Sequence, residues 1–275
     1  MWYKLKRIMM RPNGVEKQVR PVNWDNLDIS TATLSKQYST WYGFQWLYIN
    51  PNENVALTAS FGNPNGTIRG YSYSSKDIST ASLTLWNKTS PQAHSVFANS
   101  TWTHIYSWKH GFGNYSAWWI YEYSTTWWNV GSMTSYRTLS PWHWIQTVWV
   151  NQAETYAICF GAAPDATLYV YVYEISTPWD ISSATEIKAI SCAKNLHWLF
   201  FNDEMTKCVA CEYNSSSWTV YQYDRDILNS SSFPSTPTHS FWPVWFTIGY
   251  ANINESWTTL YAARENGYIY QYTLS

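Results

Sequence analysis

The chain has 275 residues, a formal net charge of −1 and only 13% charged residues. This length fits one large all-β domain or two smaller domains, and so sparse a charge gives no general attraction to nucleic acid or to an anionic membrane. No apolar run approaches the roughly 18 residues that span a bilayer. We therefore expect neither nucleic-acid binding nor membrane insertion.

Residues 1–23 differ in composition from the rest of the chain. They hold six of the 17 basic residues: Lys4, Lys6, Arg7, Arg11, Lys17 and Arg20. Pro12-Asn13-Gly14 is a turn signal, and the apolar run at residues 8–10 is too short for the core of a signal peptide. We expect a protein made in the cytoplasm without a standard export signal. Two interpretations of this segment stand: an attachment arm that docks on another protein, and a solvated leader.

A Tyr-x-Tyr unit recurs through the remaining chain at a nearly constant interval. Its first tyrosines stand at positions 71, 121, 171, 221 and 270. A fixed period of about 50 residues is typical of propeller blades or solenoid turns. Two short apolar runs, separated by a polar turn, precede each unit, and a hairpin rich in Gly, Asn and Ser leads into it. Alternation with a period of two predicts three half-buried strands in each repeat.

A further marker, Asp-Ile-Ser, predicts a fourth strand. It follows the first Tyr-x-Tyr unit at residues 77–79 and the third at 180–182, and a looser version follows the fourth at 226–228. The last repeat ends without one, but the same marker stands near the start of the chain at residues 28–30. We therefore predict that the N-terminal strand completes the last blade and closes the ring, which protects the strand edges.

The predicted fold is an all-β, five-bladed β-propeller with four-stranded antiparallel blades, because a solenoid would not need the circular offset. Residues 1–23 form the arm and residues 24–275 the propeller. The predicted blades span residues 41–89, 90–140, 141–193, 194–240, and 241–275 together with 24–40.

The repeats resemble a known family. Tyr221-Gln222-Tyr223-Asp224, residues 171–182 and residues 269–275 are similar to the "YQYTLSTPWDIS" propeller repeats of phage and environmental bacterial proteins, several of them tail-associated or on the cell surface. The resemblance covers residues 24–275. Residues 4–14 also look like the leader of some phage structural proteins. The resemblance implies a propeller fold and is weak for function.

Tryptophan is in excess. The chain has 20 Trp and 11 Gly, whereas an average glycine usage of about 7% would give roughly 19. Many Trp stand where these repeats have Gly: Trp46, Trp102, Trp118, Trp144, Trp198, Trp218, Trp245 and Trp257. Tight turns favour φ > 0, which Trp tolerates poorly. One hypothesis is that these are UGA codons that the source reads as glycine; the alternative is real Trp used for packing or sugar stacking. Trp179 is expected to be Trp in either case.

Three histidines and a glutamine share one place in the repeat when the blades are aligned on their predicted first strands. Gln45, His94, His143 and His197 each stand just before the first strand, and Val244 takes that place in the last blade. Innermost strands line the channel of a propeller, so three imidazoles there would form a ligand site at the channel mouth for a metal or an anion. The competing interpretation is that each His bonds the loops of its own blade. We expect no cofactor and no resident metal.

No nucleophile elbow, phosphate loop or His-Glu-x-x-His motif is present. The Cys208-x-x-Cys211 pair has no second half, so the four cysteines are interpreted as apolar filling.

Two function classes remain. The first, which the resemblance favours, is a non-catalytic phage virion component of the tail or surface, attached to other virion or surface proteins by its arm and contacting a host glycan or protein. The second is a lectin-like carbohydrate-binding propeller of cellular origin, resembling the five-bladed tachylectin type. A hydrolase with its site at the channel mouth is the enzymatic alternative. The first class implies a location in the virion or at the extracellular surface.

Overall fold

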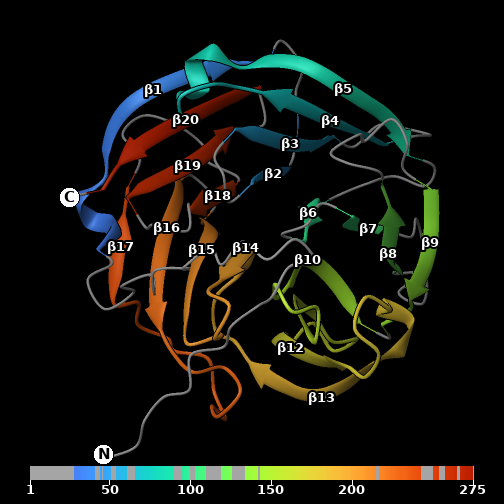
Figure 1. Ribbon diagram of the computed structural model, residues 1–275. Helices are drawn as coiled ribbons and strands as arrows, with labels where there is room; N and C mark the ends of the chain where they lie inside the picture. Colours follow the sequence, from blue (N-terminus) through green and yellow to red (C-terminus); the bar gives the residue numbers. More distant parts are fainter. Residues whose placement is uncertain are drawn as a thin grey trace, which may run out of the picture.

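The computed structural model describes residues 28–40, 44, 46–50, 54–60, 66–89, 95–99, 103–109, 119–125, 134–141, 143–214, 217–242, 250–253, 258–264 and 267–274. These residues form five four-stranded antiparallel sheets arranged around a central axis (Figure 1). The predicted five-bladed β-propeller is confirmed. Residues 1–23, including all six basic residues of the attachment arm, lie outside the described part of the chain.

In each blade the first strand lies at the axis and the fourth at the rim (Figure 1). Blade 1 contains β2 (Trp46–Ile49), β3 (Val55–Ser60), β4 (Gly66–Ser72) and β5 (Ser82–Thr89). Blade 2 contains β6 (Phe97–Ala98), β7 (His104–Lys109), β8 (Trp119–Ser124) and β9 (Thr134–Leu139). Blade 3 contains β10 (Trp144–Val150), β11 (Tyr156–Ala162), β12 (Leu168–Ile175) and β13 (Ala184–Ser191). Blade 4 contains β14 (Leu196–Phe201), β15 (Lys207–Asn214), β16 (Ser217–Asp224) and β17 (His239–Phe241). Blade 5 contains β18 (Tyr250–Ile253), β19 (Thr259–Arg264), β20 (Tyr268–Thr273) and β1 (Thr33–Ser39).

The ring closes by pairing the two ends of the chain. Strand β1 runs antiparallel to β20, with Thr33 opposite Thr273 and Ser39 opposite Tyr268. The backbone N–H of Thr40 donates to the carbonyl of Gly267 at 2.8 Å and extends this pairing. The predicted completion of the last blade by the N-terminal strand is confirmed.

An asparagine at the same position of four blades fixes the turn between the first two strands. In four blades its Oδ1 accepts the backbone N–H groups four and five residues later, at 2.8–3.1 Å, and its Nδ2 donates to the side chain four residues later. These are Asn50, Asn99, Asn151 and Asn202, all buried. One side chain thereby satisfies two backbone donors that would otherwise be costly to bury.

The Asp-Ile-Ser markers form short 3₁₀ turns before the outer strands: η2 (Ile29–Thr31), η3 (Ile78–Thr80) and η5 (Ile181–Ser183). In each, the preceding Asp accepts a hydrogen bond from the backbone N–H two residues later, and the Ile is fully buried. Residue types that cap helix starts therefore recur here for the same physical reason.

Truncation tests the closure. Deleting residues 1–40 removes η2 and β1 and exposes the outer edge of β20, so we expect a large fall in the melting temperature and aggregation of the product. Deleting residues 1–20 alone should leave the melting temperature of the ring unchanged. Equal loss in both truncations would contradict the role of β1 in closure.

Candidate functional site

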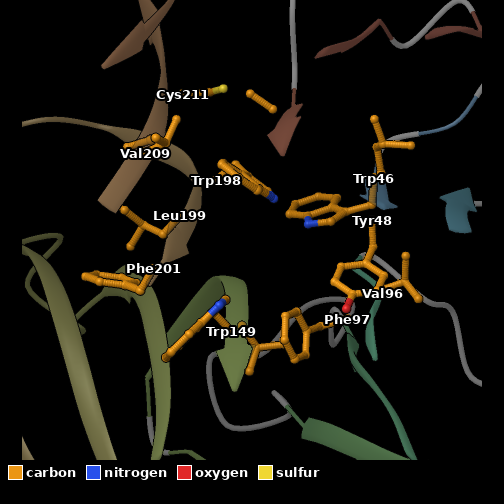
Figure 2. Packing of buried hydrophobic residues seen from close by; sticks show 14 of the residues in the cluster. Trp46, Tyr48, Val96, Phe97, Trp149, Trp198, Leu199, Phe201, Val209 and Cys211 are labelled. Carbon is orange, nitrogen blue, oxygen red and sulfur yellow. The ribbon is translucent and has the colours of Figure 1, made fainter. Parts of the chain in front are cut away.

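The axis of the ring is filled by side chains of the inner strands. Around it lie Trp46, Tyr48, Phe97, Trp149 and Trp198, which come from four blades and turn toward one another (Figure 2). Trp46 and Trp198 are 6% and 4% exposed. The cavity that these residues line, with Asn252 from blade 5, has a volume of ≈ 10 Å³, enough for about one water molecule. The described part of the axis therefore has no room for a sugar or a peptide.

The structure corrects the alignment of the histidines. The residue of blade 3 that matches His197 is Gln146, because each lies where the pairing of the inner strand shifts by one residue. His143 stands three residues earlier, outside this position. Gln45 and His94 lie outside the described residues.

His143 contacts its own blade and not the channel. Its Nε2 lies 2.8 Å from Oε2 of Glu186 on the outer strand β13, and its ring stacks on Tyr171 of β12 with centroids 4.0 Å apart. His197 is partly buried, which lowers its pKa. The predicted position shared by three histidines is therefore wrong for His143. The described residues contain no group of three or more His, Cys, Asp or Glu side chains placed to hold a metal ion.

The middle residue of the Tyr-x-Tyr unit joins one blade to the next. Gln222 of blade 4 accepts the N–H of Ile29 at 3.4 Å, and Gln271 of blade 5 accepts that of Ile78 at 3.0 Å. Glu122 of blade 2 accepts the N–H of Ile181 at 2.8 Å. In each case the acceptor lies in one blade and the 3₁₀ turn belongs to the following blade.

A basic side chain opposite this middle residue makes a second contact at the same boundaries. Lys36 reaches Asp77 at 3.1 Å, Arg137 reaches Asp180 at 3.2 Å, and His239 reaches Asp28 at 3.0 Å. The side-chain hydrogen bond from the neighbouring Ser is the first cause that lowers the pKa of Asp28 and of Asp77. Each Asp-Ile-Ser turn is thus held by a hydrogen bond to its backbone and by a contact between its Asp and a basic side chain.

The boundary between blades 2 and 3 differs from these because its middle residue, Glu122, carries a charge. The side chain of Glu122 is fully buried, and its Oε1 accepts no hydrogen bond within the described residues. The nearest cationic groups are Arg137 Nη1 at 3.5 Å and His104 Nε2 at 3.9 Å. Burial is the main cause that raises the pKa of Glu122, because a buried carboxylate loses its hydration.

A second buried carboxylate lies on the other side of His104. Glu154, from the turn between β10 and β11, is 1% exposed and its Oε2 lies 3.4 Å from His104 Nδ1. Its Oε1 accepts from Asn99 Nδ2 at 2.6 Å, and its Oε2 accepts from the Tyr106 hydroxyl. The bond to Glu154 is the first cause that raises the pKa of His104. One imidazole of blade 2 is thus bracketed by a carboxylate of its own blade and one of blade 3.

The same boundary carries an exposed tryptophan. Trp179 directly precedes Asp180 and η5, has a φ of 66° and is 56% exposed. The guanidinium of Arg137 donates to its backbone carbonyl. The exposed aromatic ring therefore stands on a turn that the buried charges hold in place.

Local sequence carries no signal for some of these residues and a partial one for others. Glu122 lies within a recognised Tyr-x-Tyr unit, but local sequence cannot predict its hydrogen bond with Ile181, which lies 59 residues later in the chain. The sequence alone does not single out Glu154, because nothing local shows that its turn contacts the neighbouring blade. The four cysteines are free and buried, as apolar filling predicts.

Comparison with models of known families and with curated proteins found no match for this chain. Within the described residues, no helix is long and apolar enough to cross a membrane.

Substitution of Glu122 separates its role as a hydrogen-bond acceptor from the effect of its buried charge. Glu122→Gln keeps an acceptor for Ile181 and removes the buried charge, as in the blades that carry Gln222 and Gln271, so at pH 8 we expect a melting temperature no lower than that of the wild type. Glu122→Ala leaves the Ile181 N–H unsatisfied and should cost about 1–3 kcal/mol. Thermal denaturation measures the melting temperature and chemical denaturation the free energy of unfolding, with Ser72→Ala at the matching position of blade 1 as the control. Equal destabilisation by Gln and Ala would contradict the acceptor role.

Proposed function

We propose that the chain is a non-catalytic binding protein, a phage virion component of the tail or surface that attaches to a host glycan or protein. The propeller is the binding unit, and residues 1–23 are the arm that joins it to other virion proteins. The resemblance of the repeats to phage and environmental bacterial propellers favours this origin, and the filled axis favours a ligand bound on the outer surface.

The observation that carries the proposal is the exposed ring of Trp179. A bulky residue in the left-handed region costs about 1–2 kcal/mol relative to an ordinary conformation, and glycine would avoid this cost. With 56% of its surface exposed, Trp179 recovers only part of the burial that a core tryptophan gains. Lys76 takes the same conformation at the matching turn of blade 1, so the turn itself does not require an aromatic ring.

The surroundings of Trp179 suit a carbohydrate. The residues next to it in the turn, Ser176, Thr177 and Ser182, are exposed hydroxyl donors and acceptors. An aromatic face covers the apolar C–H face of a sugar, and neighbouring hydroxyls bond its polar edge. A lectin-like propeller of cellular origin is the second candidate, and the same Trp179 favours it. Capsid and tail genes beside the coding sequence would support the virion origin, and their absence would support the cellular one.

Binding measurements with a matched pair of tryptophan variants test the site. After a glycan array identifies a bound sugar, Trp179→Gly should weaken its affinity by at least about tenfold, which is the scale of a binding hot spot. Because Gly relieves the left-handed strain, the melting temperature should not fall. Trp242→Ala, which removes a ring that is 64% exposed elsewhere, should leave the affinity unchanged. Equal affinity in Trp179→Gly would exclude Trp179 as the contact, and an array without any bound glycan would leave a protein as the partner.

We also propose that some of the tryptophans are glycines in the native protein, through UGA recoding. Trp102 and Trp257 each follow an Asn by three residues in the sequence, as Glu154 and Met205 do, and these two have φ values of 53° and 57°. This is a conformation that glycine adopts without cost. The coding DNA tests the idea: UGA is expected at Trp102 and Trp257 and UGG at Trp179. UGG at Trp102, Trp198, Trp218 and Trp257 would end it.

A further inference from the structure

The described boundary between blades 2 and 3 contains more buried charge than a structural joint requires. Glu154, His104 and Glu122 form a line across it, with Glu154 Oε2 3.4 Å from His104 Nδ1 and Glu122 Oε1 3.9 Å from His104 Nε2. Arg137 lies 3.5 Å from Glu122 Oε1. Arg137 also lies 3.2 Å from Asp180. With His104 protonated, two cations therefore face three carboxylates, and with His104 neutral Arg137 alone faces them.

The next boundary shows that this charge is optional for the fold. Between blades 3 and 4, Met205 takes the place of Glu154, and Val172 takes the place of Glu122. Both are buried apolar side chains, and the Ile227 N–H there bonds the carbonyl of Met205 instead. Apolar residues can therefore join two blades at this place. Buried ion pairs are seldom the most stable choice, so the charged array is a candidate for a role beyond stability.

We propose that the Glu154–His104–Glu122 array is a proton-operated joint: protonated His104 holds blades 2 and 3 together, and loss of its proton loosens both the boundary and the turn that carries Trp179. The connection to that turn is direct. Glu122 Oε2 accepts the N–H of Ile181 at 2.8 Å, and Arg137 contacts Asp180 and the carbonyl of Trp179. The joint does not depend on which ligand the ring binds.

The groups that face His104 give its response a definite sign. Among the described residues they are Glu122 on β8, Glu154 from blade 3, Tyr106 on β7 and, beyond Glu122, Arg137 on β9 with its partner Asp180. The pKa of His104 is raised above its ordinary value of 6.5. A raised His pKa gives stability that is complete below 6.5 and is lost as the pH rises through the folded-state value. The pKa of Glu122 is raised by burial, so its ionisation opposes folding in the same direction.

Hydrogen exchange on the full chain tests the joint. Between about pH 5.5 and about pH 8.5, which bracket an ordinary imidazole, protection of the peptide that contains Ile181 should fall by about tenfold after correction for the intrinsic exchange rate. His104→Gln, which cannot take up the proton, should abolish this pH dependence. The control His143→Gln removes the contact between His143 and Glu186 within blade 3, which is 2.8 Å long. It should preserve the pH dependence.

An unchanged pH dependence in His104→Gln, or constant protection in the wild type, would overturn the proposal. If His104→Gln does not fold, NMR titration of the wild-type imidazoles replaces it. A His104 transition above 6.5 that coincides with the loss of Ile181 protection supports the joint, and a transition at or below 6.5 refutes it. Neither measurement uses a glycan, so failure of the joint and failure of the proposed binding function are distinguishable.

Discussion

One hydrogen bond between blades organises this propeller: the side chain at the centre of a Tyr-x-Tyr unit accepts the backbone N–H of the Ile in the next blade's turn. Alternation in a strand makes this placement necessary. The two tyrosines share one face of the strand, so the middle residue must point the other way, toward the neighbouring turn. Gln222, Gln271 and Glu122 fill this role at three boundaries. The turn that Gln222 holds is η2, which directly precedes β1 near the start of the chain. The bond that joins blades 4 and 5 therefore also fixes β1 in place.

The chemistry of each boundary then depends on one choice of acceptor. Glutamine supplies the carbonyl oxygen without a charge. Glutamate supplies it with a charge that must be compensated in a dry environment, and Arg137 and His104 stand within 3.5 Å and 3.9 Å of it. Valine supplies no acceptor, and at Val172 the turn finds a backbone carbonyl instead. A fold built from similar blades thus places a fully buried carboxylate beside a histidine at the boundary between blades 2 and 3, whereas the matching acceptors Gln222 and Gln271 are uncharged.

The architecture could be predicted from the sequence because the signals that define each blade are local. The period of the Tyr-x-Tyr units, the polar turns and the displaced Asp-Ile-Ser marker all lie within single repeats, and together they predict five blades and the closure. The contacts between blades are not local, so the partners of Glu122 and Glu154 were out of reach. His143 is misplaced because the sequence alignment matches Trp144 with Trp198. The register shifts of the two inner strands show that Thr147 is the residue that matches Trp198, three positions later.

Position within the ring decides what kind of function each region can have. At the axis, aromatic rings from four blades meet and leave space of ≈ 10 Å³, so this region contributes rigidity. At the rim, the 3₁₀ turns place single side chains on the surface while their backbones are held from the preceding blade. Such a turn is rigid enough to present a ring at low conformational cost, which favours binding. Trp179 lies on a turn that is held by Glu122, a fully buried carboxylate next to His104. Recognition at the surface and charge inside the boundary are therefore linked through the few backbone atoms between Trp179 and Ile181.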